Sequence, residues 1–171
     1  IGAMTTSQLG ALTSVQVGAL TSTLIGALST TQIGGITSTQ IGLMTTTQMD
    51  GLTSAQLNKL TATQTAGFKS TQVSSLDTTQ LAGFDTTQFG ALTTTAISGL
   101  MTSNLSALST TMFSVFSAAQ LGALTTTQAV SLTTTQLTNL SATQLGGLTS
   151  TQMGVLPPTQ LGGFTTTTLC R

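Results

Sequence analysis

The chain has 171 residues, a formal net charge of zero, only three basic and three acidic residues, and no His. This composition excludes the basic surface that nucleic-acid binding needs, and with 39% hydrophobic residues it also lacks the signature of disorder. The longest apolar runs are only a few residues, far below the roughly 20 that span a bilayer, so no transmembrane segment is expected.

An eight-residue repeat organises the whole sequence. After the three residues IGA, the chain divides into 21 consecutive octapeptides that start at Met4 and show no insertion or deletion. Position one is large and apolar, positions two to four are mostly Thr or Ser, position five is Gln in 16 of 21 units, and position six is again mostly apolar. Because independent loops tolerate changes of length, the constant period predicts a single repeat array over residues 1–171.

The polar half of each octapeptide has the pattern of a helix N-terminus. A hydroxyl at position two, followed three residues later by Gln, is a capping box, and the apolar residues at positions one and six then form a hydrophobic staple. Asp77 and Asp85 replace Thr at the capping position, and Pro158 falls at the first helical position, where proline is favoured. The expected capping pairs are Thr45–Gln48, Thr53–Gln56, Asp77–Gln80, Asp85–Gln88, Thr125–Gln128, Thr133–Gln136 and Thr149–Gln152.

Each predicted helix has about six residues and is too short to be stable alone. Burial of two large side chains stabilises one octapeptide by roughly 3–6 kcal/mol, whereas ordering its eight residues costs on the order of 8–16 kcal/mol. We therefore expect an all-α solenoid of short capped helical turns, one per octapeptide. The small residues at positions seven and eight would let neighbouring units approach closely.

A β-solenoid with two octapeptides per coil is the alternative fold. Thr favours strands, and stacked Gln side chains can form ladders. Positions one and six have opposite parity, however, so a continuous strand would point them to opposite faces of a sheet. Only in a β-solenoid could the Thr residues form the flat array that an ice-binding surface requires.

The sequence offers no set of residues for catalysis. The three carboxylates, Asp50, Asp77 and Asp85, are scattered, and their spacing assembles no acid–base pair, nucleophile triad or metal cluster. We expect no enzyme activity, no cofactor and no metal site. Cys170 is the single cysteine, so it is either an inert thiol or the site of an interchain disulfide.

The octapeptide resembles the tandem L-[ST]-T-[AT]-Q-[IV]-x-A repeats of large bacterial surface proteins, often labelled adhesin-like. That resemblance implies an extracellular or cell-surface location. Low charge and uniform repeats predict a structural, non-enzymatic protein that self-associates and forms or contributes to a filament, sheath or adhesin stalk. The expected partners are copies of the same chain, with glycans on Ser and Thr as a further expectation. The alternative function is a surface-binding module, either an adhesin or an ice-binding protein, that uses a Thr-rich face.

Overall fold

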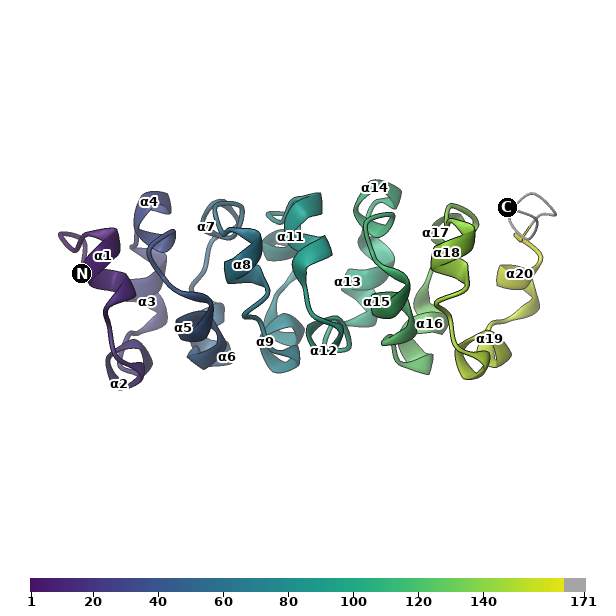
Figure 1. The fold of residues 1–171 in the computed structure, drawn as a ribbon, viewed down its shortest axis with the longest axis horizontal. Helices are drawn as coiled ribbons and strands as arrows, with labels where there is room; N and C mark the ends of the chain where they lie inside the picture. The colour runs from purple at the N-terminus through teal and green to yellow at the C-terminus, as the bar shows by residue number, and fades with distance from the viewer. Residues whose placement is uncertain (165–171) are drawn as a thin grey trace. The chain divides into compact units, whose positions relative to one another are not determined.

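The computed structural model describes residues 1–164, which form twenty short α-helices and no β-strand (Figure 1). One helix lies in each of the first twenty octapeptides, so the all-α solenoid is the observed fold. The β-solenoid alternative is wrong for this range, and the flat β-face of an ice-binding surface is absent from it. The helices are α1 (Thr6–Gly10), α2 (Ser14–Gly18), α3 (Ser22–Gly26), α4 (Thr30–Ile33), α5 (Ser38–Leu43), α6 (Thr46–Met49), α7 (Ser54–Leu57), α8 (Ala62–Thr65), α9 (Ser70–Ser75), α10 (Thr78–Leu81), α11 (Thr86–Ala91), α12 (Thr94–Ile97), α13 (Thr102–Ala107), α14 (Thr110–Phe113), α15 (Ala118–Gly122), α16 (Thr126–Ser131), α17 (Thr134–Thr138), α18 (Ala142–Leu145), α19 (Ser150–Val155) and α20 (Pro158–Leu161).

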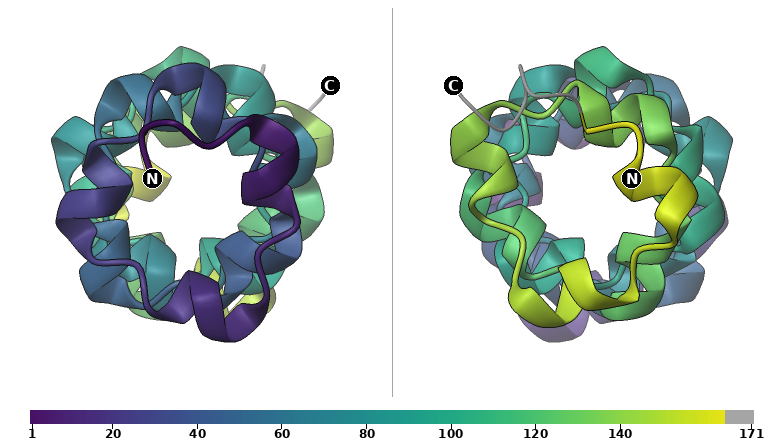
Figure 2. Two further views of the ribbon diagram at one scale, coloured as in Figure 1. Left: turned by 90° about the vertical axis from the view of Figure 1, so that its left-hand side faces the viewer. Right: turned by 90° about the vertical axis from the view of Figure 1, so that its right-hand side faces the viewer.

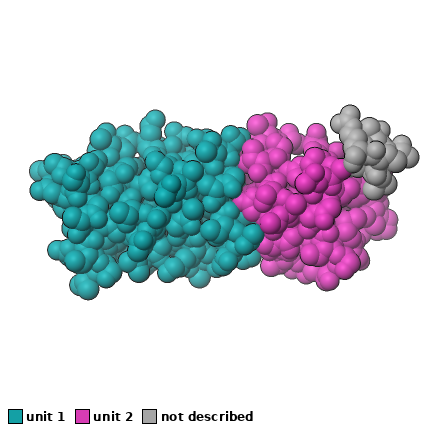
Figure 3. Space-filling view, in the orientation of Figure 1, with its two compact units in different colours: residues 1–99 teal, residues 100–171 magenta. Residues whose placement is uncertain are grey.

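The chain divides into two compact units, which Figure 3 shows in different colours. Unit 1 comprises Ile1–Gly99 and contains α1 to α12, and unit 2 comprises Leu100–Arg171 and contains α13 to α20. The division falls between two octapeptides, so neither unit splits a repeat.

Within each unit the helices stack with a regular offset. In unit 1, α1 packs against α4, α2 against α5, and the series continues to α9 against α12. In unit 2, α13 packs against α16 in the same way, and the series ends with α17 against α20. In the left view of Figure 2, α1 to α4 run clockwise as they recede from the viewer, so unit 1 winds as a right-handed coil.

The core of each unit comes from positions one and six of the octapeptides, whose apolar side chains are buried inside the coil. Aromatic residues supply the largest of these side chains. In unit 1 the ring centroids of Phe68 and Phe84 lie 5.7 Å apart, and those of Phe84 and Phe89 lie 5.6 Å apart. In unit 2 the rings of Phe113 and Phe116 meet edge to face at 5.3 Å. The spacing of positions one and six therefore gives most of the short helices two anchors in the core of their own unit.

Candidate functional site

The surface on which one turn of the coil rests on the next is the most regular polar feature of the molecule. We call it the turn interface. It consists of the Gln at position five, the residue at position eight, and two backbone carbonyls of the preceding turn. These carbonyls belong to position six of one octapeptide and to position one of the octapeptide that follows it. Its parts recur at eight-residue intervals in both units.

The Gln side chain first acts locally, at the N-terminus of its own helix. In α7 the backbone N–H of Thr53 donates to Gln56 Oε1 at 2.8 Å, and the backbone N–H of Gln56 donates to Thr53 Oγ1 at 3.2 Å. Both hydrogen bonds of a capping box are present, which satisfies two N–H groups that a helix start leaves without an intrahelical partner. The same reciprocal arrangement is found in all seven pairs expected from the sequence: Thr45–Gln48, Thr53–Gln56, Asp77–Gln80, Asp85–Gln88, Thr125–Gln128, Thr133–Gln136 and Thr149–Gln152.

The same Gln side chain also reaches across to the preceding turn. Gln56 Nε2 donates to Ile25 O at 2.9 Å and to Leu28 O at 2.7 Å. These carbonyls lie 31 and 28 residues earlier in the chain, so one turn takes between three and four octapeptides. In unit 1, inter-turn donors of this kind are Gln32, Gln40, Gln48, Gln56, Gln64, Gln72, Gln80 and Gln88. In unit 2 they include Gln128, Gln136, Gln144, Gln152 and Gln160.

These hydrogen bonds contribute to stability because most of the Gln side chains that make them are buried. Gln56 is only 2% exposed, and an unpaired amide in such a place would cost on the order of 1–3 kcal/mol. The carbonyls that accept from Nε2 belong to the end of one short helix and to the residue that leads into the next. Ile25 O also accepts from the backbone N–H of Leu28 at 3.1 Å, so the Gln56 amide is a further donor to it. Gln56 therefore accepts from the N-cap N–H in its own turn and donates to helix-end carbonyls of the preceding turn.

The capping function follows from the sequence pattern, whereas the inter-turn function was missed. One signal could have revealed it. A capping box accepts Glu as readily as Gln, because only a side-chain oxygen is needed. This chain has Gln at position five in 16 of 21 octapeptides and contains no Glu at all. The exclusive choice of the amide indicates that the side chain must also donate.

Two N-cap residues that are not Ser, Thr or Asp show which groups a capping box needs. Lys69 precedes α9, and its N–H donates to Gln72 Oε1 at 2.8 Å, but an ammonium cannot accept from Gln72 N, so only half of the box exists. Pro157 precedes α20 and has no N–H to donate. The buried Oε1 of Gln160 consequently has no hydrogen-bond partner in the part of the chain that the structure describes.

Glycine at position eight allows the turns to touch backbone to backbone. A Cβ atom built on Gly67 would lie 2.3 Å from Ser38 O and within 2.9 Å of Ser38 Cα. No Gly in the described range has a positive φ, so close approach, and not backbone conformation, is what requires Gly here. The equivalent contacts are Gly35 on Thr6, Gly51 on Ser22, Gly83 on Ser54 and Gly99 on Ser70 in unit 1, and Gly147 on Ala118 in unit 2.

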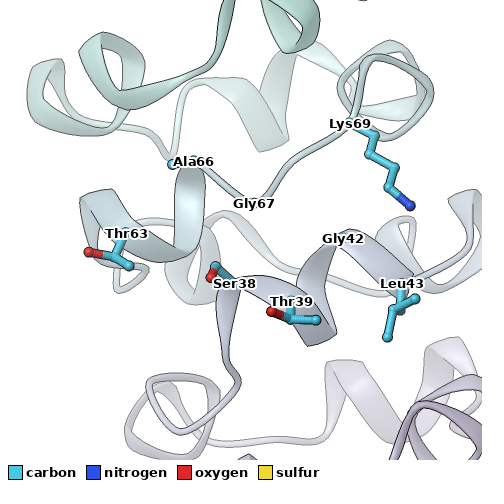
Figure 4. A pocket seen from close by; sticks show the side chains of 8 residues that line it. All are labelled: Ser38, Thr39, Gly42, Leu43, Thr63, Ala66, Gly67 and Lys69. Carbon is cyan, nitrogen blue, oxygen red and sulfur yellow. The ribbon is translucent and has the colours of Figure 1, made fainter.

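Three of the charged side chains, Lys69, Asp50 and Asp77, line open grooves between turns. Lys69 extends from the start of α9 over α5, and its Cε would be 3.8 Å from a Cβ on Gly42 (Figure 4). Its groove has a volume of about 490 Å³, and it is lined by hydroxyls and by the half-exposed Leu43. The methylene groups of Lys69 therefore cover apolar surface while the ammonium stays in water.

The acidic side chains do not combine into a larger site. Asp50 and Asp77 line one groove, and Asp85 does not line it. Lys69, Asp77 and Asp85 precede three consecutive helices, α9 to α11, whereas the helices that stack are three apart. Within residues 1–164, no three His, Cys, Asp or Glu side chains gather as they would around a metal ion. None of the helices in this range is long and apolar enough to cross a bilayer. Cys170 lies outside the described residues.

Sequence comparison identifies the repeat. Residues 1–30 and 25–54 match the model of a family described as the ALTTAQ repeat. Both segments carry the octapeptide that forms the turn interface, and the match shows a tandem repeat protein. No curated protein and no solved structure matches the chain significantly.

Proposed function

We propose that this protein is a structural, non-enzymatic repeat protein that self-associates and forms or contributes to an extracellular filament, sheath or adhesin stalk. The observation that carries the proposal is the turn interface. It recurs at eight-residue intervals, and in most of the described repeats a Gln side chain ties one turn to the previous one through amide–carbonyl hydrogen bonds, as Gln56 and Gln152 do. A scaffold of this kind maintains a fixed spacing along the coil without any single active site.

The outer surface supports self-association. Positions two to four of the octapeptides are mostly exposed hydroxyl residues, as in Thr133, Thr134 and Thr135. With only six charged residues in 171, copies of the chain repel one another weakly. Such a surface can pack against a copy of itself without leaving a buried charge unpaired.

An extracellular location is part of the same proposal. It rests on the resemblance of the octapeptide to the repeats of bacterial surface proteins. The hydroxyls at position four are mostly exposed, those at position three are exposed or half-buried, and neither is needed for capping, so we propose that glycans are carried at these two positions. A hydroxyl at position two is engaged in the capping box, as Thr53 is in α7.

A surface-binding module remains the second candidate function. The observation that favours it is the array of exposed Thr side chains, which offers many equivalent hydroxyls to a glycan or another cell surface. Binding of this kind is saturable and is lost when the Thr face is altered while assembly persists. A purely structural role predicts that the same change alters assembly alone.

Sedimentation velocity and negative-stain electron microscopy of residues 1–171 test the proposed function. The protein is examined in reducing buffer over a wide range of concentrations, so that a disulfide through Cys170 does not contribute. We expect the average sedimentation coefficient to rise with concentration and repeating assemblies to be visible. A single monomeric species at every concentration would contradict the structural role.

A further inference from the structure

Two of the three asparagines in the chain begin the tripeptide that accepts an N-linked glycan. That tripeptide is Asn-x-Ser or Asn-x-Thr, in which x is any residue except Pro. Residues 104–106 and residues 139–141 both read Asn-Leu-Ser. Asn58 is followed by Lys59 and Leu60, so it has no hydroxyl residue two positions later. Because Ser and Thr are abundant here, the tripeptide alone is not specific, and the surroundings of each asparagine decide.

The structure separates the two tripeptides by burial. Asn104 lies inside α13 at position five of its octapeptide, and it is only 3% exposed. A transferase cannot contact an amide in such a place. Asn139 lies at position eight, directly after the last residue of α17, and both Asn139 and Ser141 are exposed. The tripeptide at 139–141 is therefore the one that an enzyme can reach in the folded chain.

The exposure of Asn139 is typical of side chains at position eight. In the middle of unit 1, with turns before and after them, Leu43 and Lys59 occupy position eight, and both are exposed. A side chain at this position thus reaches the outer surface of a complete array. An N-linked glycan is bulky and needs such a surface.

The Nδ2 atom of Asn139 can be modified without leaving a carbonyl unpaired. It donates to Thr135 O at 2.8 Å, and the same carbonyl also accepts from Asn139 N at 3.3 Å and from Thr138 Oγ1 at 3.2 Å. A primary amide has two N–H groups, and a glycan replaces only one of them. Ser141, which completes the tripeptide, also forms the capping box with Gln144, so the repeat itself places a hydroxyl two residues after position eight.

From these observations we propose that Asn139 carries an N-linked glycan. The proposal rests on the extracellular location proposed above and adds a linkage through nitrogen to the glycans on hydroxyls. The co-substrate is a sugar activated at C1 by a phosphate or pyrophosphate leaving group, and a transferase of the producing cell brings the two together. The bond from Nδ2 to C1 forms, and the bond from C1 to the phosphate oxygen breaks. The phosphate leaves with the electron pair, and Nδ2 loses one proton to a base of the transferase.

Four variants test which features of the chain select the acceptor. Ser141→Ala removes the hydroxyl of the tripeptide, whereas Ser141→Thr keeps both the tripeptide and the cap, so we expect loss of the glycan in the first and full retention in the second. Lys59→Asn places the tripeptide at position eight of unit 1, because Leu60 and Thr61 follow, and we expect a second glycan there. Asn104→Gln is the control, which removes the buried tripeptide and should leave occupancy unchanged.

Peptide mass spectrometry of the chain from the cells that naturally produce it measures the occupancy, with the cell surface and the cell interior analysed separately. A peptide N-glycosidase, which leaves Asp at the modified position, identifies the linkage, and far-ultraviolet circular dichroism checks that the helicity of each variant is unchanged. We expect sugar on the peptide that contains Asn139 and none on the peptide that contains Asn104.

The outcomes distinguish this proposal from the proposed function. A chain at the cell surface with an unmodified Asn139 would overturn the glycan and leave the extracellular structural role standing. A chain found only in the cell interior and unmodified would overturn both the location and the glycan. Equal occupancy of Asn104 and Asn139, or a Lys59→Asn variant at the surface that gains no second glycan, would contradict selection by exposure at position eight.

Discussion

The side-chain nitrogen of Gln56 lies 2.7 Å from the carbonyl oxygen of Leu28, a residue 28 positions earlier in the chain. This hydrogen bond joins two turns of the coil, while the oxygen of the same side chain accepts from the N-cap residue of its own helix. One amide therefore links local helix formation to the stacking of turns. A helix of four to six residues persists in this protein because neither of its ends is left without hydrogen-bond partners.

Replacement of Gln56 by Glu should separate the two functions of this side chain. The capping oxygen remains, but the donor is lost and a carboxylate faces two carbonyl oxygens in a buried place. We expect the free energy of unfolding to fall by about 2–4 kcal/mol at pH 7, measured by urea denaturation. Gln16→Glu is the control, because Gln16 caps α2 and its side-chain hydrogen bonds within residues 1–164 are all to Thr13, so its effect should stay within about 0.5 kcal/mol.

The effect of Gln56→Glu should depend on pH in a defined direction. Burial and the facing carbonyls favour the neutral form, so the pKa of the introduced carboxyl is higher in the folded state than the unfolded value of about 4.3. The charge-related part of the destabilisation is therefore absent below the unfolded pKa and grows as the pH rises toward the folded pKa. Unfolding of variant and wild type, compared at pH 3 and pH 7, measures this difference. An equal loss of stability at both pH values would contradict the burial of side chain 56 against the carbonyls of the preceding turn.

The effect of replacing a glycine on stability should depend on whether that glycine contacts a neighbouring turn. In Gly67→Ala the new methyl group meets the backbone of Ser38, which cannot move without separating the turns, so we expect a destabilisation of about 1–3 kcal/mol. A methyl group on Gly18 would meet no other part of the molecule within 4 Å, and Gly18→Ala should be neutral or stabilising by up to about 1 kcal/mol. Thermal unfolding of the two variants measures the contrast, and equal effects would argue against backbone contact between turns.

Restoring the missing donor at residue 157 should stabilise unit 2. Pro157 has φ −67° and ψ 154°, close to the values at Thr149, so Thr fits the backbone there. In Pro157→Thr the new N–H would donate to the buried Gln160 Oε1, and the new hydroxyl would accept from Gln160 N. We expect a gain of about 1–2 kcal/mol in the free energy of unfolding, measured by urea denaturation. Pro157→Ala restores the N–H alone and should give part of the gain.

A good part of the fold could be predicted from the octapeptide. The Thr-x-x-Gln spacing fixes each helix start, and the staple positions define the core, because both depend on contacts within a few residues. The offset between turns could not be predicted in this way. It is set by how Gln56 reaches Ile25 and Leu28 and how Gly67 rests on Ser38, which are contacts between residues about 30 apart. A local pattern contains no information on that distance.

The most direct test of the account is a nuclear Overhauser measurement on protein labelled selectively in Gln, Ile and Leu. We predict cross-peaks from the Nε2 protons of Gln56 to protons of Ile25 and Leu28, alongside the local contacts to Thr53. Cross-peaks to Thr53 alone, or to residues one or two octapeptides away, would show that Gln caps its helix without joining the turns and would contradict the account.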